Sequence, residues 1–106
     1  MSEYILLMYN DAQDHSIVND AENWSRYLDA LYASGQFAEI SAIGGGLCCK
    51  KDEADLGAND KQQDQQQIVG SIRIRAENPL AAKQWLVGNP VYEAGGTVEI
   101  RALLRD

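Results

Sequence analysis

The chain has little of the chemistry that marks most catalytic and metal sites. Its 106 residues include one histidine and two cysteines, and the cysteines, Cys48 and Cys49, are adjacent. Adjacency excludes the C-x-x-C spacing of zinc and redox motifs and would strain a mutual disulfide. The glycine-rich residues around them offer no base that would activate a thiolate. We therefore interpret both as reduced, inert thiols and predict no metal and no cofactor.

Positive charge is also scarce. The chain has 9 Lys and Arg residues against 16 Asp and Glu residues, which gives a net charge of −7. The basic residues are scattered along the sequence rather than gathered on one predicted helix. An acidic surface repels a phosphate backbone, so we do not expect nucleic acid as a partner.

Long hydrophobic runs are missing as well. The apolar run near the start of the sequence, residues 4–9, follows Glu3 and is too short for a secretion signal or a membrane span. We therefore expect no membrane partner and a cytoplasmic location.

What is present is the composition of an ordinary folded protein. Hydrophobic residues make up 45% of the chain and charged residues 24%, which favours neither disorder nor a membrane class. A chain of this length builds one hydrophobic core, so we expect a single domain over residues 1–106.

Alternating hydrophobicity and, for the first strand, a run of β-forming residues predict four strands. Residues 68–75 alternate most regularly, with an isoleucine face expected beneath the helices, and residues 3–9 are apolar on both faces. Residues 37–43 and 97–104 follow the same period more loosely. Because both faces of the first strand are apolar, both should lie against something dry.

Helical periodicity and capping residues predict two helices. The first begins at Asn19 or Asp20 and ends at Gly35. The second begins at Asn78-Pro79 and ends at Gly88. The first helix has apolar residues at the spacing of one face: Trp24, Tyr27, Leu28, Leu31 and Tyr32.

The remaining segments are predicted to lie outside these elements. Residues 11–18 read as irregular, and residues 91–94 as one loose turn after Asn89-Pro90 stops the second helix. Residues 47–67 read as a long solvated loop, with a short edge strand allowed at residues 47–50.

The order β-α-β-β-α-β predicts an α+β fold of ferredoxin-like topology. In it a four-stranded antiparallel sheet carries both helices on one face. The other face would be left bare and apolar, and pairing two such sheets would cover it. We therefore predict a homodimer through the open sheet face, with two-fold symmetry.

Three segments resemble the YCII-related proteins and their DGPF branch: residues 4–9 (YILLMY), 28–35 (LDALYASG) and 90–101 (PVYEAGGTVEIR). The resemblance implies a dimeric α/β barrel. The DGPF tetrapeptide, expected near residues 58–61, is absent, and Trp24 and Ala33 occupy the places of the His and Asp proposed as catalytic in YCII proteins. The resemblance therefore implies the fold and the dimer but transfers no catalytic residue.

Three groups of residues are candidates for a site. His15, near Asp11 or Asp14, is either a carboxylate-oriented base or a solvated loop residue. The aromatic residues Trp24, Tyr27, Tyr32 and Trp85 either line a pocket for a flat ligand or belong to the core. The third group is Arg73, Glu99 and Arg101, on strands expected to be adjacent. These residues either hold an anionic ligand in the dimer cleft, form cross-strand ion pairs, or make polar contacts between subunits.

Two functions remain open. The favoured one is a dimeric small-molecule-binding or regulatory module, with a cleft between sheet and helices lined by Trp24, Tyr27 and Tyr92, and with Arg73 and Arg101 on an anionic group. The alternative is a small lyase or hydrolase acting on a small organic or anionic substrate, with His15 and Asp11 for proton transfer and Arg73 on an anionic group.

Overall fold

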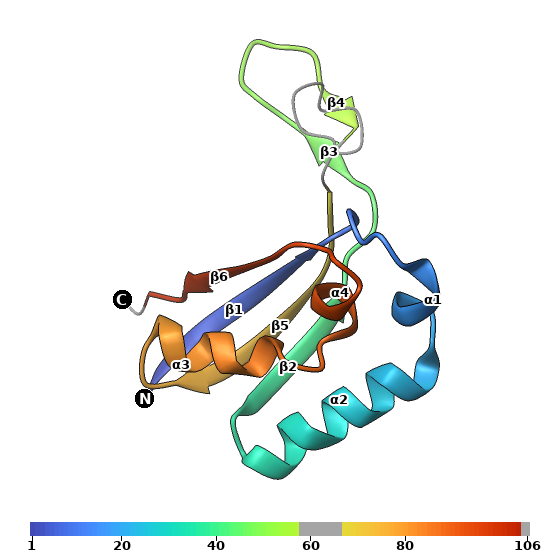
Figure 1. Cartoon of the computed structure of the whole chain (residues 1–106). Coiled ribbons are helices and arrows are strands. Elements are labelled where there is room, and N and C mark those ends of the chain that lie inside the picture. The colour runs from blue at the N-terminus through green and yellow to red at the C-terminus, as the bar shows by residue number, and fades with distance from the viewer. Residues whose placement is uncertain (58–66, 105–106) are drawn as a thin grey trace.

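The computed structural model describes residues 1–57 and 67–104 and shows an α+β fold built on one antiparallel sheet (Figure 1). Its strand order is β2-β5-β1-β6, so the two central strands are β5 and β1. The predicted four-stranded antiparallel sheet is confirmed, although the last strand is shorter than expected. The bounds are β1 Ser2–Tyr9, β2 Phe37–Ala42, β5 Ile68–Ala76 and β6 Val98–Ala102.

The longest helix, α2 (Ala21–Ser34), has the caps that its sequence predicts. The Asp20 side chain accepts a hydrogen bond from the backbone N–H of Glu22, which satisfies one of the unpaired groups of the first turn. Gly35 ends the helix with φ 73°, a left-handed conformation that glycine adopts without a steric cost. Within the described residues, no helix is both long enough and apolar enough to cross a bilayer.

Three short helices correct the predicted boundaries. The segment expected to be irregular contains α1 (His15–Val18), and the loose turn is α4 (Pro90–Glu93). The second predicted helix ends early as α3 (Pro79–Lys83), which is followed by the 3-10 turn η2 (Gln84–Leu86). Each short α-helix begins after an Asp or Asn side chain that accepts backbone N–H groups. The capping residues are Asp14, Asn78 and Asn89.

The hydrophobic core lies between the helices and one face of the sheet. Ile72 and Ile74 of β5 are fully buried there, as the alternation of that strand predicts. They pack with Leu6 of β1 and with Tyr27 and Leu31 of α2. All the helices lie on this side of the sheet (Figure 1).

The opposite face of the sheet carries the alternate residues of the same strands. Ile5, Leu7 and Tyr9 of β1 remain partly exposed there. Ile5 lies between Arg73 of β5 and Arg101 of β6 in the strand register. This open face is therefore an apolar strip with charged residues on both sides.

A second, two-stranded sheet projects beyond one end of the main sheet (Figure 1). It pairs β3 (Leu47–Cys48) with β4 (Leu56–Gly57). The segment predicted as a solvated loop with an edge strand thus contains a small sheet of its own, and its strands do not extend the main sheet. Residues 58–66, where the DGPF tetrapeptide would fall, lie outside the described residues.

Candidate functional site

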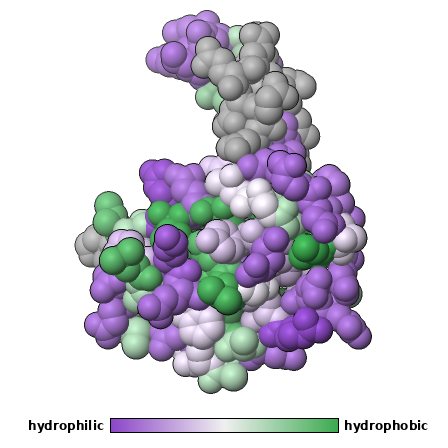
Figure 2. Space-filling model, in the orientation of Figure 1, coloured by the Kyte–Doolittle hydropathy of each residue, from purple (hydrophilic) through white to green (hydrophobic). Residues whose placement is uncertain are grey.

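A cavity of about 450 Å³ opens between the helices, on the side of the molecule away from the open sheet face. This volume lies within the range of small-molecule sites. Figure 2 shows that side as mostly hydrophilic, with hydrophobic residues reaching the surface near its centre. We call it the helix cavity, and its lining comes from α1, α2, the turn before α4, and α4 itself: Ile17, Asn23, Arg26, Tyr27, Ala30, Val87, Gly88, Pro90 and Glu93.

Tyr27 forms a fixed wall of the helix cavity. Its ring is buried, and it meets the ring of Trp24 edge to face with centroids 6.4 Å apart. Its hydroxyl donates to the backbone carbonyl of Trp85 at 2.7 Å. Burial raises the pKa of Tyr27, and a hydrogen bond with the Asn89 side chain opposes this in part. The phenol therefore stays neutral and presents mainly its ring.

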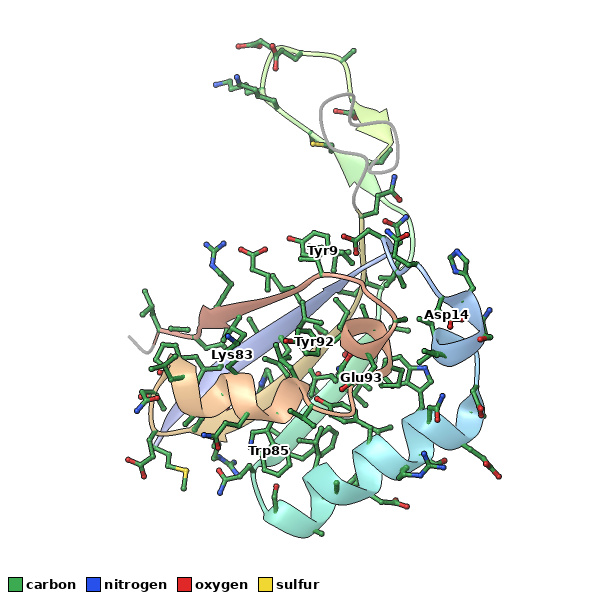
Figure 3. The ribbon with its side chains drawn as sticks, viewed as in Figure 1. Tyr9, Asp14, Lys83, Trp85, Tyr92 and Glu93 are labelled. Atoms are coloured by element: carbon green, nitrogen blue, oxygen red, sulfur yellow. The ribbon has the colours of Figure 1, made fainter. Side chains whose placement is uncertain are left out.

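Two opposite charges line the helix cavity from different elements. Arg26 on α2 is exposed and donates one hydrogen bond, of 3.5 Å, to the Asn23 side chain. Glu93 on α4 accepts the backbone N–H of Gly88 at 2.8 Å through Oε2. Within residues 1–57 and 67–104, neither side chain forms an ion pair with the other or with any third group. Figure 3 shows Glu93 on the part of α4 that lies above α2.

Asn89 holds α4 in place. Its side chain is fully buried, and its Oδ1 accepts the backbone N–H groups of Val91 and Tyr92 at 3.0 and 3.1 Å. Its amide nitrogen lies 3.7 Å from the sulfur of Met8. The position of Glu93, one turn along α4, therefore depends on this buried cap.

A smaller cavity of about 210 Å³ lies between α2 and the sheet, in the place where sequence reasoning expected the cleft. Trp24 lines it, held by a hydrogen bond of 2.6 Å from its indole N–H to the carbonyl of Val18. Met8, Val69 and Val91 make most of the remaining wall apolar. With this volume and lining, it lacks the size and the charged groups of the helix cavity.

His15 and Asp11 lie outside the helix cavity. His15 is exposed at the start of α1. The Asp11 carboxylate accepts the backbone N–H of Thr97 at 2.8 Å and its hydroxyl at 2.6 Å, which fixes the start of β6. The Ser16 hydroxyl donates to the neighbouring carboxylate of Asp14 and holds its pKa below the usual value.

The two predicted arginines lie on the open sheet face, away from the aromatic residues. Arg73 contacts the carboxylates of Glu3 and Glu39 at 3.6 and 3.5 Å. Arg101 contacts Glu99 of its own strand at 2.7 Å. The expectation that their strands are adjacent was wrong, because β1 lies between β5 and β6. Arg73 therefore forms cross-strand ion pairs, whereas the ion pair of Arg101 lies within β6.

The other aromatic candidates contribute differently. Tyr92 is 42% exposed on α4 and lines neither of the two cavities described above. Tyr32 packs on Phe37 with ring centroids 4.6 Å apart, which joins α2 to β2. Trp24 and Tyr27 therefore line the two cavities described above, and Trp85 lines another cavity, of about 240 Å³, beside α3.

Sequence reasoning did not find Arg26, Glu93 and Asn89. Arg26 reads as an ordinary solvated helix position and Glu93 falls in the segment predicted as one loose turn, and no local pattern connects them. Asn89 did carry a signal, since Asn-Pro also begins α3. Across residues 1–57 and 67–104, no three His, Cys, Asp or Glu side chains gather as a metal-binding group. A scan against models of protein families and a search of curated proteins both found no match for this chain.

Proposed function

We propose that this protein is a small-molecule-binding module whose ligand occupies the helix cavity. The observation that carries the proposal is the cavity itself: about 450 Å³, walled by the Tyr27 ring and bordered by Arg26 and Glu93. Binding sites of this kind combine an apolar lining with a few polar groups that orient the ligand.

A binding role fits the site better than a catalytic one. The enzyme alternative rests on His15 and Asp11, and the Asp11 oxygens already bond to Thr97. Among the described residues, the lining of the helix cavity contains one carboxylate and one guanidinium and no histidine, cysteine or serine. Such a lining can orient a ligand but offers no nucleophile beside a base.

We further propose that two copies pair through the open sheet face, in the ferredoxin-like, dimeric α/β-barrel arrangement that the resemblance to YCII-related proteins implies. The register supports this proposal. Glu39, Arg73, Ile5 and Arg101 form one row across the four strands, with Glu39 at one edge of the sheet and Arg101 at the other. A two-fold axis along the strands would bring Glu39 of one copy near Arg101 of the other.

An NMR fragment screen tests the binding proposal. Fragments of drug-like size are added to the ¹⁵N-labelled protein, and amide shifts are followed at Tyr27, Ala30, Gly88 and Glu93. We expect hits to shift these amides together. Ala30→Phe fills the helix cavity and should abolish the shifts, whereas Ala33→Phe, on an exposed position of the same helix, should not. Hits that bind Ala30→Phe unchanged would refute the assignment.

A further inference from the structure

Two opposite charges line the helix cavity. Arg26 and Glu93 line the same cavity from α2 and α4, yet they form no ion pair with one another or elsewhere among residues 1–57 and 67–104. On the open sheet face of the same protein, by contrast, Arg73 and Arg101 are each paired with carboxylates. The cavity thus holds a cation and an anion that are both left for other partners.

Each group keeps most of its hydrogen-bonding capacity. A guanidinium has five donors, and Arg26 uses one of them on the Asn23 side chain. A carboxylate has two acceptor oxygens, and Glu93 uses Oε2 on the backbone of Gly88. Among the residues that the structure describes, Oε1 of Glu93 and the rest of the Arg26 guanidinium have no protein partner and can bind a ligand.

Apart from the two charges, the described lining of the helix cavity is largely apolar. The Tyr27 hydroxyl is already committed to the carbonyl of Trp85. Ile17, Ala30 and Pro90 complete this part of the lining. A ligand that reached both charges would therefore lay a hydrocarbon or aromatic body against the Tyr27 ring.

We infer that the ligand of the helix cavity is a small zwitterion of the amino-acid class. Its carboxylate binds Arg26, its ammonium group binds Glu93, and its apolar part packs on Tyr27. Carboxylate recognition by a guanidinium and ammonium recognition by a carboxylate are both charge-assisted and strong for their size. The inference rests on the proposed function, because it names the ligand class for the same cavity.

Three probes that share one ring test the inference by isothermal titration calorimetry. L-phenylalanine carries both charges, 3-phenylpropionate only the carboxylate, and 2-phenylethylamine only the ammonium group. We expect L-phenylalanine to bind about tenfold more tightly than either single-charge probe, which corresponds to one charge-assisted hydrogen bond. In a second arm, 6-aminohexanoate shows whether the cavity prefers adjacent or separated charges.

Two variants should separate the roles of the charges. Arg26→Gln should weaken the binding of L-phenylalanine about tenfold and leave that of 2-phenylethylamine unchanged. Glu93→Gln should also weaken the binding of L-phenylalanine about tenfold but leave that of 3-phenylpropionate unchanged. Gln at position 93 still accepts the Gly88 N–H, so the turn before α4 is kept. Arg75→Gln, an exposed arginine on β5 that does not line the cavity, is the matched control and should bind like the parent chain.

The outcomes distinguish this inference from the proposed function. If all four probes are lost in Ala30→Phe but bind the two charge variants as they bind the parent, the cavity is a binding site and the zwitterion inference is refuted. If neither zwitterion binds the parent chain more tightly than the single-charge probes, the inference also fails. If Ala30→Phe binds every probe unchanged, both the zwitterion inference and the assignment of the helix cavity as a binding site fail.

Discussion

The buried side chain of Asn89 fixes the start of α4, which forms part of the cavity wall. It is fully buried and satisfies two backbone N–H groups of α4. A buried donor left without its acceptor costs more free energy than an exposed one, which finds water.

Asn89→Ala should therefore destabilise the protein by about 2–3 kcal/mol, since it removes a cap and leaves buried groups unpaired. Asn78→Ala removes the equivalent cap of α3 at an exposed position and should cost about 1 kcal/mol. Urea denaturation followed by circular dichroism measures both. Equal losses for the two variants would show that burial at position 89 adds nothing.

The carboxylate of Glu99 offers a test of a single hydrogen bond. The Tyr9 hydroxyl donates to it at 2.6 Å and, together with Arg101, lowers the pKa of Glu99. A carboxyl whose folded pKa is lowered stabilises the fold above its unfolded pKa of about 4.3 and loses that effect as pH falls through the folded value.

Tyr9→Phe should raise the pKa of Glu99 towards its ordinary value, because the largest cause of the lowering is lost. The stability difference between parent and variant should then shrink as the pH falls below the carboxyl range. A ¹³C NMR titration of the Glu99 carboxyl reports the pKa directly, with Tyr32→Phe as the control. An unchanged pKa in Tyr9→Phe would contradict the assignment.

At the scale of elements, α4 is held by the chain that follows it as well as by its cap. A Cβ added at Gly96 would lie 2.7 Å from a methyl carbon of Val91 and 2.9 Å from its carbonyl oxygen. Backbone atoms cannot rotate away as a flexible side chain can, so α4 itself would have to move.

Gly96→Ala should destabilise the protein by about 1–3 kcal/mol and weaken any ligand of the helix cavity, because it displaces the element that carries Glu93. Gly46→Ala adds a Cβ where nothing lies within 4 Å and should leave both properties unchanged. Thermal unfolding and calorimetric titration measure the two effects. A stable Gly96→Ala with parent-like unfolding would mean that α4 adapts freely.

The same elements show how far sequence reasoning reaches. Strong periods predicted β5 and α2, and a run of β-forming residues predicted β1, because a pattern sustained along a whole element outweighs local exceptions. The short helices α1 and α4 have four residues each and are too brief to show a period. Asn89-Pro90 had the chemistry of a helix start, as at α3, yet it was interpreted only as a stop.

The site was predictable only in part for a related reason. Tyr27 lies on the apolar face of a periodic helix, so its place at a wall could be predicted. Arg26 and Glu93 line the same cavity because α2 and α4 pack together, and no feature of either segment encodes that packing. The order of strands likewise decides that Arg73 and Arg101 flank Ile5 rather than each other.

At the scale of the whole molecule, the open sheet face leaves an apolar strip uncovered in a single copy. It presents Leu7 beside Ile5 in the strip between charged residues. If two copies pair there, an aspartate in the strip would be buried against the second sheet without a partner.

Leu7→Asp should therefore shift the protein from dimer to monomer at micromolar concentration, as measured by light scattering coupled to gel filtration. Leu80→Asp, on a side chain that is 76% exposed on α3, should leave the dimer intact. A parent chain that elutes with the mass of a monomer would contradict the proposed pairing, and so would a dimer that survives Leu7→Asp.

The most direct test of the central claim, a small-molecule ligand in the helix cavity, is native mass spectrometry of the protein purified from its own host. We expect the parent chain and Ala33→Phe to retain a small molecule that Ala30→Phe lacks, because only the last substitution fills the cavity. If Ala30→Phe retains the same molecule at the same stoichiometry as the parent chain, the ligand binds elsewhere and the account is wrong.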